Sequence, residues 1–143
     1  MKKLIFFIFL IPNILNAGSM KMIGMPGKSN DVNRVIKVSM YDNYYQPNKF
    51  KVKKDETIKF VIQNKGELVH EFNIASKEMH LKHQPEMQMM VEHEILLADK
   101  IDKKKMMEMA KKNSAMAHKH PNSVLLSPGE SAELIWKFNN SLD

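Results

Sequence analysis

The chain has 143 residues, 43% hydrophobic and 27% charged, so its length suits one domain and its composition is typical of neither a disordered nor a membrane-embedded protein. Its 22 Lys and Arg outnumber 16 Asp and Glu, but no basic stripe is interleaved with aromatic residues, so we expect no nucleic-acid partner. The absence of cysteine excludes disulfides, thiolate nucleophiles and every metal site that depends on cysteine sulfur.

Residues 1–17 are typical of a secretory signal peptide. Lys2 and Lys3 precede an apolar run that starts at Leu4, and small residues follow at Ala17-Gly18-Ser19. The run is too short to span a bilayer comfortably, although an uncleaved membrane anchor is the alternative interpretation. We therefore expect cleavage after Ala17, export to the periplasm and no membrane-spanning segment in the mature protein.

Residues 18–33 are rich in Gly, Ser, Met and Asn, which predicts a flexible leader before a domain at 34–143. In the first part of that domain, residues 49–53, 57–62 and 69–74 carry β-forming residues, and the first and last of these segments alternate apolar and polar side chains. Short strands at this spacing favour an antiparallel sandwich or barrel.

From about residue 76 to residue 120 the hydrophobic period changes to that of a helix. Pro85 suits the first position of a helix with Met87, Met90 and Val91 on one face, and Asp99 or Asp102 can cap a second helix. Strand alternation returns after residue 123 and continues through Trp136. The sequence therefore predicts a mainly β domain with a helical insertion.

Soft and borderline metal ligands are concentrated in this insertion. Eight Met and five His lie within the 42 residues from Met79 to His120. Thioether sulfur selects Cu(I), and imidazole accepts either oxidation state of copper, so a copper site is a reasonable hypothesis. The Met residues on apolar helix faces are better explained as core, because Met fills irregular gaps.

Several side chains remain candidate metal ligands. Met89 and His93 are an i, i+4 pair that could share one ion. His80 and His83, like His118 and His120, could converge in a loop, but solvated surface histidines are the alternative for each pair. No nucleophile elbow, phosphate-binding loop or H-E-x-x-H motif is present, so we expect no enzymatic activity.

Two sets of motifs resemble the cupredoxins, the plastocyanin and azurin superfamily. The first set runs from Tyr45-Gln46-Pro47 through Asp55-Glu56-Thr57 and Asn64-Lys65-Gly66 to His70-Glu71-Phe72, and the second is Ser127-Pro128-Gly129-Glu130. The resemblance is greatest to exported copper-tolerance cupredoxins with a Met- and His-containing insertion. It implies a Greek-key β-sandwich, and it places His70 at the position of the family's first copper ligand.

The sequence departs from this pattern after Trp136-Lys137-Phe138, where the family has further strands and a loop with Cys, His and Met ligands. We therefore expect no blue copper centre, an open sheet edge at residues 132–138, and a Trp136 less buried than in a complete domain. The candidate metal ligands are His70, His80, His83, Met89, His93, His118 and His120.

Together these observations predict an exported copper-binding protein that acts in copper tolerance, with another periplasmic copper-handling or redox protein as a conceivable partner. One alternative is a type 1 electron carrier, if the gene product has the missing loop. A second alternative is a metal-free binding module that retains the sandwich.

Overall fold

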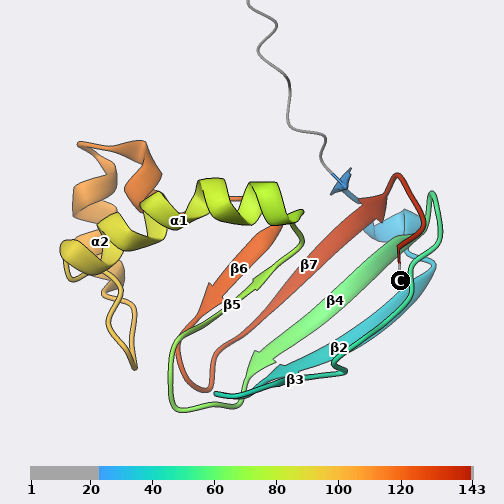
Figure 1. Ribbon diagram of the computed structural model, residues 1–143, viewed down its shortest axis with the longest axis horizontal. Coiled ribbons are helices and arrows are strands. Elements are labelled where there is room, and N and C mark those ends of the chain that lie inside the picture. The colour runs from blue at the N-terminus through green and yellow to red at the C-terminus, as the bar shows by residue number, and fades with distance from the viewer. Residues whose placement is uncertain (1–22, 143) are drawn as a thin grey trace, which may run out of the picture.

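Two β-sheets face each other in the computed structural model, which describes residues 23–142. The larger sheet has the order β1-β7-β4-β2-β3 (Figure 1). Its strands are β1 (Gly24–Pro26), β2 (Arg34–Met40), β3 (Tyr45–Gln46), β4 (Thr57–Asn64) and β7 (Ser131–Phe138). The pairing of β2 with β4 is parallel, and the other pairings in this sheet are antiparallel.

The smaller sheet consists of the antiparallel strands β5 (His70–Asn73) and β6 (Ser123–Leu126). Residues 74–122 connect them and carry helices α1 (Lys77–Glu92) and α2 (Lys103–Ala110), which lie together at one side of the sandwich (Figure 1). Short 3-10 turns lie at Ser29–Asp31 and Ser114–Ala117. Both helices thus fall within the segment for which a helical insertion was predicted.

The core between the sheets follows from the alternation of the strands. Alternate side chains of β4 from Ile58 to Ile62 are fully buried, and the Phe60 ring contacts Phe50, Phe72 and Phe138. A second, smaller core forms in the insertion around the buried Met90, Ile95 and Met116. Met87, Met106 and Met109 pack against it, so the prediction that the helical Met residues are mostly core is confirmed.

The open edge expected at residues 132–138 is wrong at residues 136–138, and so is the expected exposure of Trp136. Strand β7 lies between β1 and β4, and the Trp136 side chain is fully buried. The reason is that Gly24–Pro26, part of the expected flexible leader at 18–33, pairs with β7 over Trp136–Phe138. The leader prediction therefore fails for these residues, while residues 18–22 and the predicted signal peptide lie outside the described residues.

Two local predictions also differ from the structure. Residues 49–53 do not form a strand, because Val52 alone makes a β-bridge, to Leu142. Helix α1 begins well before Pro85, since the Ser76 side chain caps it by accepting a hydrogen bond from the Met79 N–H. Within residues 23–142, no helix combines the length and apolar character needed to cross a membrane.

Candidate metal centre

Helix α1 presents a stripe of three possible ligands. Met79, His83 and Glu86 follow each other at spacings of four and three residues, so they lie on one helix face. The Ser76 cap fixes the start of this helix and thereby places the stripe opposite the end of the insertion. Glu86 was not among the sequence candidates, although its i, i+3 spacing from His83 is a signal that could have identified it.

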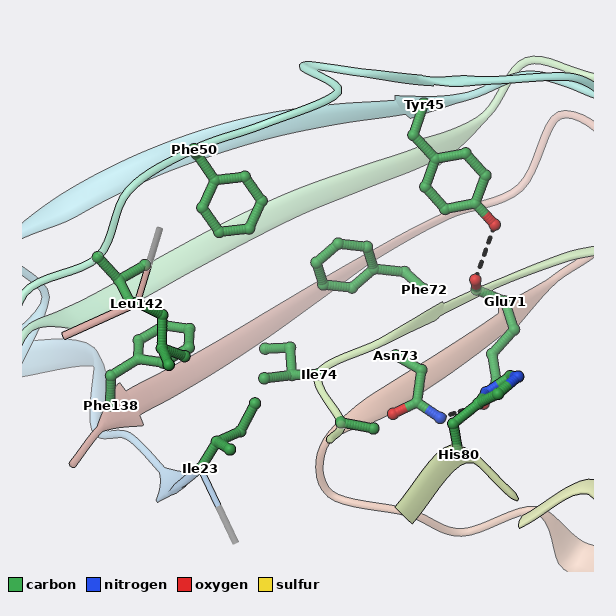
Figure 2. A pocket seen from close by; sticks show the side chains of 12 residues that line it. Ile23, Tyr45, Phe50, Glu71, Phe72, Asn73, Ile74, His80, Phe138 and Leu142 are labelled. Atoms are coloured by element: carbon green, nitrogen blue, oxygen red, sulfur yellow. Dashed lines mark hydrogen bonds between the residues drawn. The ribbon is translucent and has the colours of Figure 1, made fainter. Parts of the chain in front are cut away.

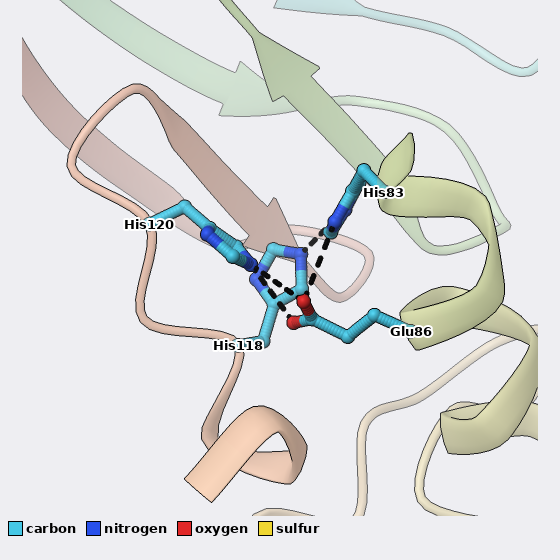
Figure 3. Close-up of side chains that lie close together, drawn as sticks. All are labelled: His83, Glu86, His118 and His120. Carbon is cyan, nitrogen blue, oxygen red and sulfur yellow. Dashed lines mark hydrogen bonds and ion pairs between the residues drawn. The ribbon is translucent and has the colours of Figure 1, made fainter. Parts of the chain in front are cut away.

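The chain after the second 3-10 turn supplies two more imidazoles. His118 has a left-handed backbone with φ of 44°, and its N–H donates to the Ala115 carbonyl. Both the His118 and the His120 rings point toward α1 (Figure 3). The convergence of His118 and His120 that was left open in the sequence is therefore observed.

These side chains form a compact cluster (Figure 3). One nitrogen or oxygen from each of His83, Glu86, His118 and His120 lies within 4.8 Å of the others. The three ring centroids are 4.9–5.1 Å apart, and the Nε2 atoms of His83 and His118 are separated by 3.2 Å. His120 Nε2 donates to both oxygens of Glu86, at 2.8 and 3.0 Å.

A second carboxylate approaches the cluster from the sheet. Glu71 of β5 places Oε1 3.2 Å from His83 Nε2 and 3.3 Å from His118 Nε2. Burial alone would raise the pKa of Glu71, but the hydrogen bond from His118 and the charges of His83 and His118 together hold that pKa below its ordinary value. Glu71 is therefore an anion at neutral pH, and like Glu86 it was not predicted.

The cluster has an opening to solvent. A cavity of about 200 Å³ is lined by Met79, His83, Glu86 and His120, together with Lys82 and residues of the strand ends. His118 is only 3% exposed and His83 10%, whereas His120 is 35% exposed. An ion could thus enter past His120 and be shielded from water at His83 and His118.

A larger cavity of about 480 Å³ lies between the two sheets (Figure 2). Its wall is mostly apolar, from residues such as Phe50, Phe72 and Phe138, and the Tyr45 hydroxyl donates to the Glu71 carbonyl at one end. His80 lines this cavity rather than the metal cluster and is exposed.

Four of the seven sequence candidates therefore lie outside the cluster. His70 points away from it, with its Nε2 2.9 Å from Asp42 Oδ1, because successive residues of a strand face opposite sides. The His93 ring bonds to the Met89 carbonyl, and the Met89 sulfur accepts from Asn113, so this pair does not converge on a shared point. His83, His118 and His120 are the predicted residues that the fold brings together.

A β-sandwich with a His-lined helical insertion is the architecture to compare with known protein families. A family model described as a cupredoxin-like domain matches residues 13–101, which is more than half of the chain. The chain therefore belongs to the cupredoxin-like family, and the predicted fold class is confirmed. No solved structure matches it significantly.

Curated relatives carry the name copper-resistant cuproprotein CopI. The chain is 38% identical to that of Pseudomonas aeruginosa over 124 residues, covering 82% of this chain and 68% of the relative. It is 30% identical to that of Vibrio cholerae over 125 residues, covering 83% and 58%. The protein of Rubrivivax gelatinosus is 26% identical over 119 residues, covering 82% and 58%. The chain thus spans less than two thirds of the latter two relatives.

The donor atoms decide which copper chemistry this chain can support. A type 1 centre does not fit, because it needs a thiolate and the sequence contains no cysteine. Three imidazoles with carboxylates do fit a divalent copper ion, and imidazole also suits zinc. The cluster of His83, His118, His120 and Glu86, rather than His70, is accordingly the candidate metal centre.

Proposed function

We propose that the protein is an exported copper-binding protein of copper tolerance, and that it holds the ion at His83, Glu86, His118 and His120. The observation that carries this proposal is the convergence of three imidazoles and a carboxylate within 4.8 Å, at the base of an open cavity. The names of the relatives indicate that the ion is copper and that the role is copper tolerance.

The proposed activity is sequestration, without catalysis. A bound copper ion would have imidazole and carboxylate ligands, with the sulfur of Met79 at the rim of the same cavity. His83 and His118 would hold the ion away from water, with Glu86 and His120 as the ligands on its more exposed side. Shielding of this kind keeps copper from reacting with other molecules.

The test is a titration of the mature chain, starting at Gly18, with Cu(II) and with Cu(I) against competing chromogenic chelators. We expect stoichiometric binding, and a pale Cu(II) complex because there is no thiolate to give intense absorption. The double variant His83→Gln/His118→Gln should lose at least about tenfold in affinity. The matched control His80→Gln/His93→Gln, which changes two exposed imidazoles outside the cluster, should bind as the wild type does.

The variant His70→Gln tests whether copper binds at the cluster or at His70, which is at the position of the family's first copper ligand. Because Asp42 engages the His70 ring, we expect unchanged copper affinity in this variant. If only His70→Gln weakens binding, the site is at His70 and the proposed cluster is wrong. If the wild type withdraws no copper from the chelators, the metal-free binding module takes the place of this proposal.

Export is part of the proposal and rests on residues 1–17. Intact-mass measurement of a periplasmic fraction should show a chain that begins at Gly18. Recovery of the protein in the cytoplasm with Met1 retained would contradict export and leave the copper titration unaffected.

A further inference from the structure

Glu71 forms a regular triangle with two imidazoles of the candidate metal centre. Its Oε1 is 3.2 Å from His83 Nε2 and 3.3 Å from His118 Nε2, and the two nitrogens are 3.2 Å apart. Ligand atoms that sit about 2.0 Å from a tetrahedral ion are separated by about 3.3 Å. The three atoms therefore have the spacing of one face of a tetrahedral coordination shell.

The position of Glu71 is fixed by a rigid element. Strand β5 pairs with β6 so that Glu71 is opposite Leu125, and the Tyr45 hydroxyl donates to the Glu71 carbonyl at 2.8 Å. The side chain is 14% exposed, and its Oε1 also accepts from Asn73 Nδ2 at 3.3 Å. A ligand held on a strand keeps its geometry better than one on a loop, so this carboxylate is pre-organised.

We propose that Glu71 is a direct metal ligand, and that the ion sits on the face formed by Glu71, His83 and His118. The fourth position then falls to the pair of His120 and Glu86 on the solvent side, where the cavity opens. This inference deepens the proposed function and rests on it. It moves the ion inward, to the junction between the insertion and the smaller sheet.

The proposal specifies the preferred ion. Two imidazole nitrogens and a carboxylate oxygen are borderline and hard donors, which suit Cu(II) and Zn(II), whereas thioethers suit Cu(I). The sequence had left Cu(I), Cu(II) or both open. The site at Glu71 holds Cu(II) more tightly than a site made of the three imidazoles alone.

The test compares Glu71→Gln with Glu78→Gln in the mature chain. Glu78 lies in the first turn of α1, is exposed and pairs with Lys82, so its replacement removes one carboxylate without touching the cluster. We expect Glu71→Gln to lower Cu(II) and Zn(II) affinity at least about tenfold and Cu(I) affinity much less. Bound Co(II), a spectroscopic probe for tetrahedral sites, should lose its intense visible bands in Glu71→Gln only.

The binding results for these variants distinguish failure of the Glu71 proposal from failure of the proposed function. If Glu71→Gln binds Cu(II) like the wild type while His83→Gln/His118→Gln does not, Glu71 is no ligand and the proposed function stands. If neither the wild type nor any variant binds copper, the proposed function itself fails. Should Glu71→Gln not fold, as judged by circular dichroism, Glu71→Asp keeps the charge but withdraws the oxygens by one methylene. Wild-type affinity in Glu71→Asp, with Co(II) bands unchanged, would overturn the proposal.

Discussion

Replacing Asn64 with Ala should remove one of the polar links between the two sheets. Asn64 ends β4 and is fully buried. Its Nδ2 donates to the carbonyls of Leu68 at 2.7 Å and Leu126 at 2.9 Å, and its Oδ1 accepts from the Gly66 N–H at 3.0 Å. One side chain thus shapes the turn that leads into β5 and ties that turn to the end of β6.

The expected cost follows from these three hydrogen bonds. Each contributes about 1 kcal/mol net, so Asn64→Ala should lower the free energy of unfolding by about 3 kcal/mol. The Leu126 carbonyl is left in a buried environment, which adds to the cost because water cannot replace the lost donor. Against a typical domain stability of about 5–15 kcal/mol, the variant should still fold but with a large loss.

Urea denaturation followed by Trp136 fluorescence measures this effect. With a slope of about 1.5 kcal/mol per molar urea, the midpoint should fall by about 2 M. Gln63→Ala, at the exposed neighbouring position on the same strand, is the control and should change stability by less than about 0.5 kcal/mol. A loss in Asn64→Ala no greater than that of the control would refute the idea that this side chain holds the sheets together.

Three further predictions concern other parts of the fold. In Gly24→Ala, a Cβ would lie 2.3 Å from the Lys137 carbonyl oxygen, so β1 should detach and the Trp136 emission should shift to the red; unchanged emission would contradict the close packing. Met90→Ala, in the core of the insertion, should cost about 2–5 kcal/mol in thermal unfolding, whereas Met107→Ala, 64% exposed, should cost almost nothing. The hydrogen bond with His70, followed by those from the Glu67 and Leu68 N–H groups, holds the pKa of Asp42 below its ordinary value of 3.8. A depressed pKa contributes stability that is present above the ordinary value and is lost as pH falls through the folded-state value. The difference in urea stability between wild type and Asp42→Asn should therefore shrink as the pH falls through and below 3.8; a constant difference would argue against this hydrogen-bonded contact.

The sequence was informative where periodicity decides the structure. Alternation located β5 and β7, a run of β-forming residues located β4, and the helical spacing of Met90 and its neighbours identified core residues of the insertion. It was misleading at residues 49–53, where a strand-like alternation makes a single bridge at Val52. It also could not show that β1 covers β7, since three residues such as Gly24–Pro26 carry no period to detect.

The metal centre was only partly predictable, for a physical reason. His83, His118 and His120 were candidates by residue type, but their convergence depends on the packing of α1 against a segment about 35 residues later, which residue identity alone does not indicate. Glu71 reaches the cluster through tertiary packing of β5 beneath α1, so no local spacing could have indicated it. Met89 and His93 had favourable spacing, yet their side chains bond to nearby groups instead.

The two ends of the helical insertion meet at a short distance. The Ile74 N–H donates to the Asn122 carbonyl at 2.8 Å, and Asn122 Nδ2 donates to the Ile74 carbonyl at 3.1 Å. Segments whose ends lie this close can be exchanged for others without moving the scaffold that carries them. The insertion is therefore a transplantable module: replaced by a short hairpin, it would leave the register of β5 and β6 intact, and grafted onto another antiparallel pair with an acidic residue at the position of Glu71, it would carry its ligand set along.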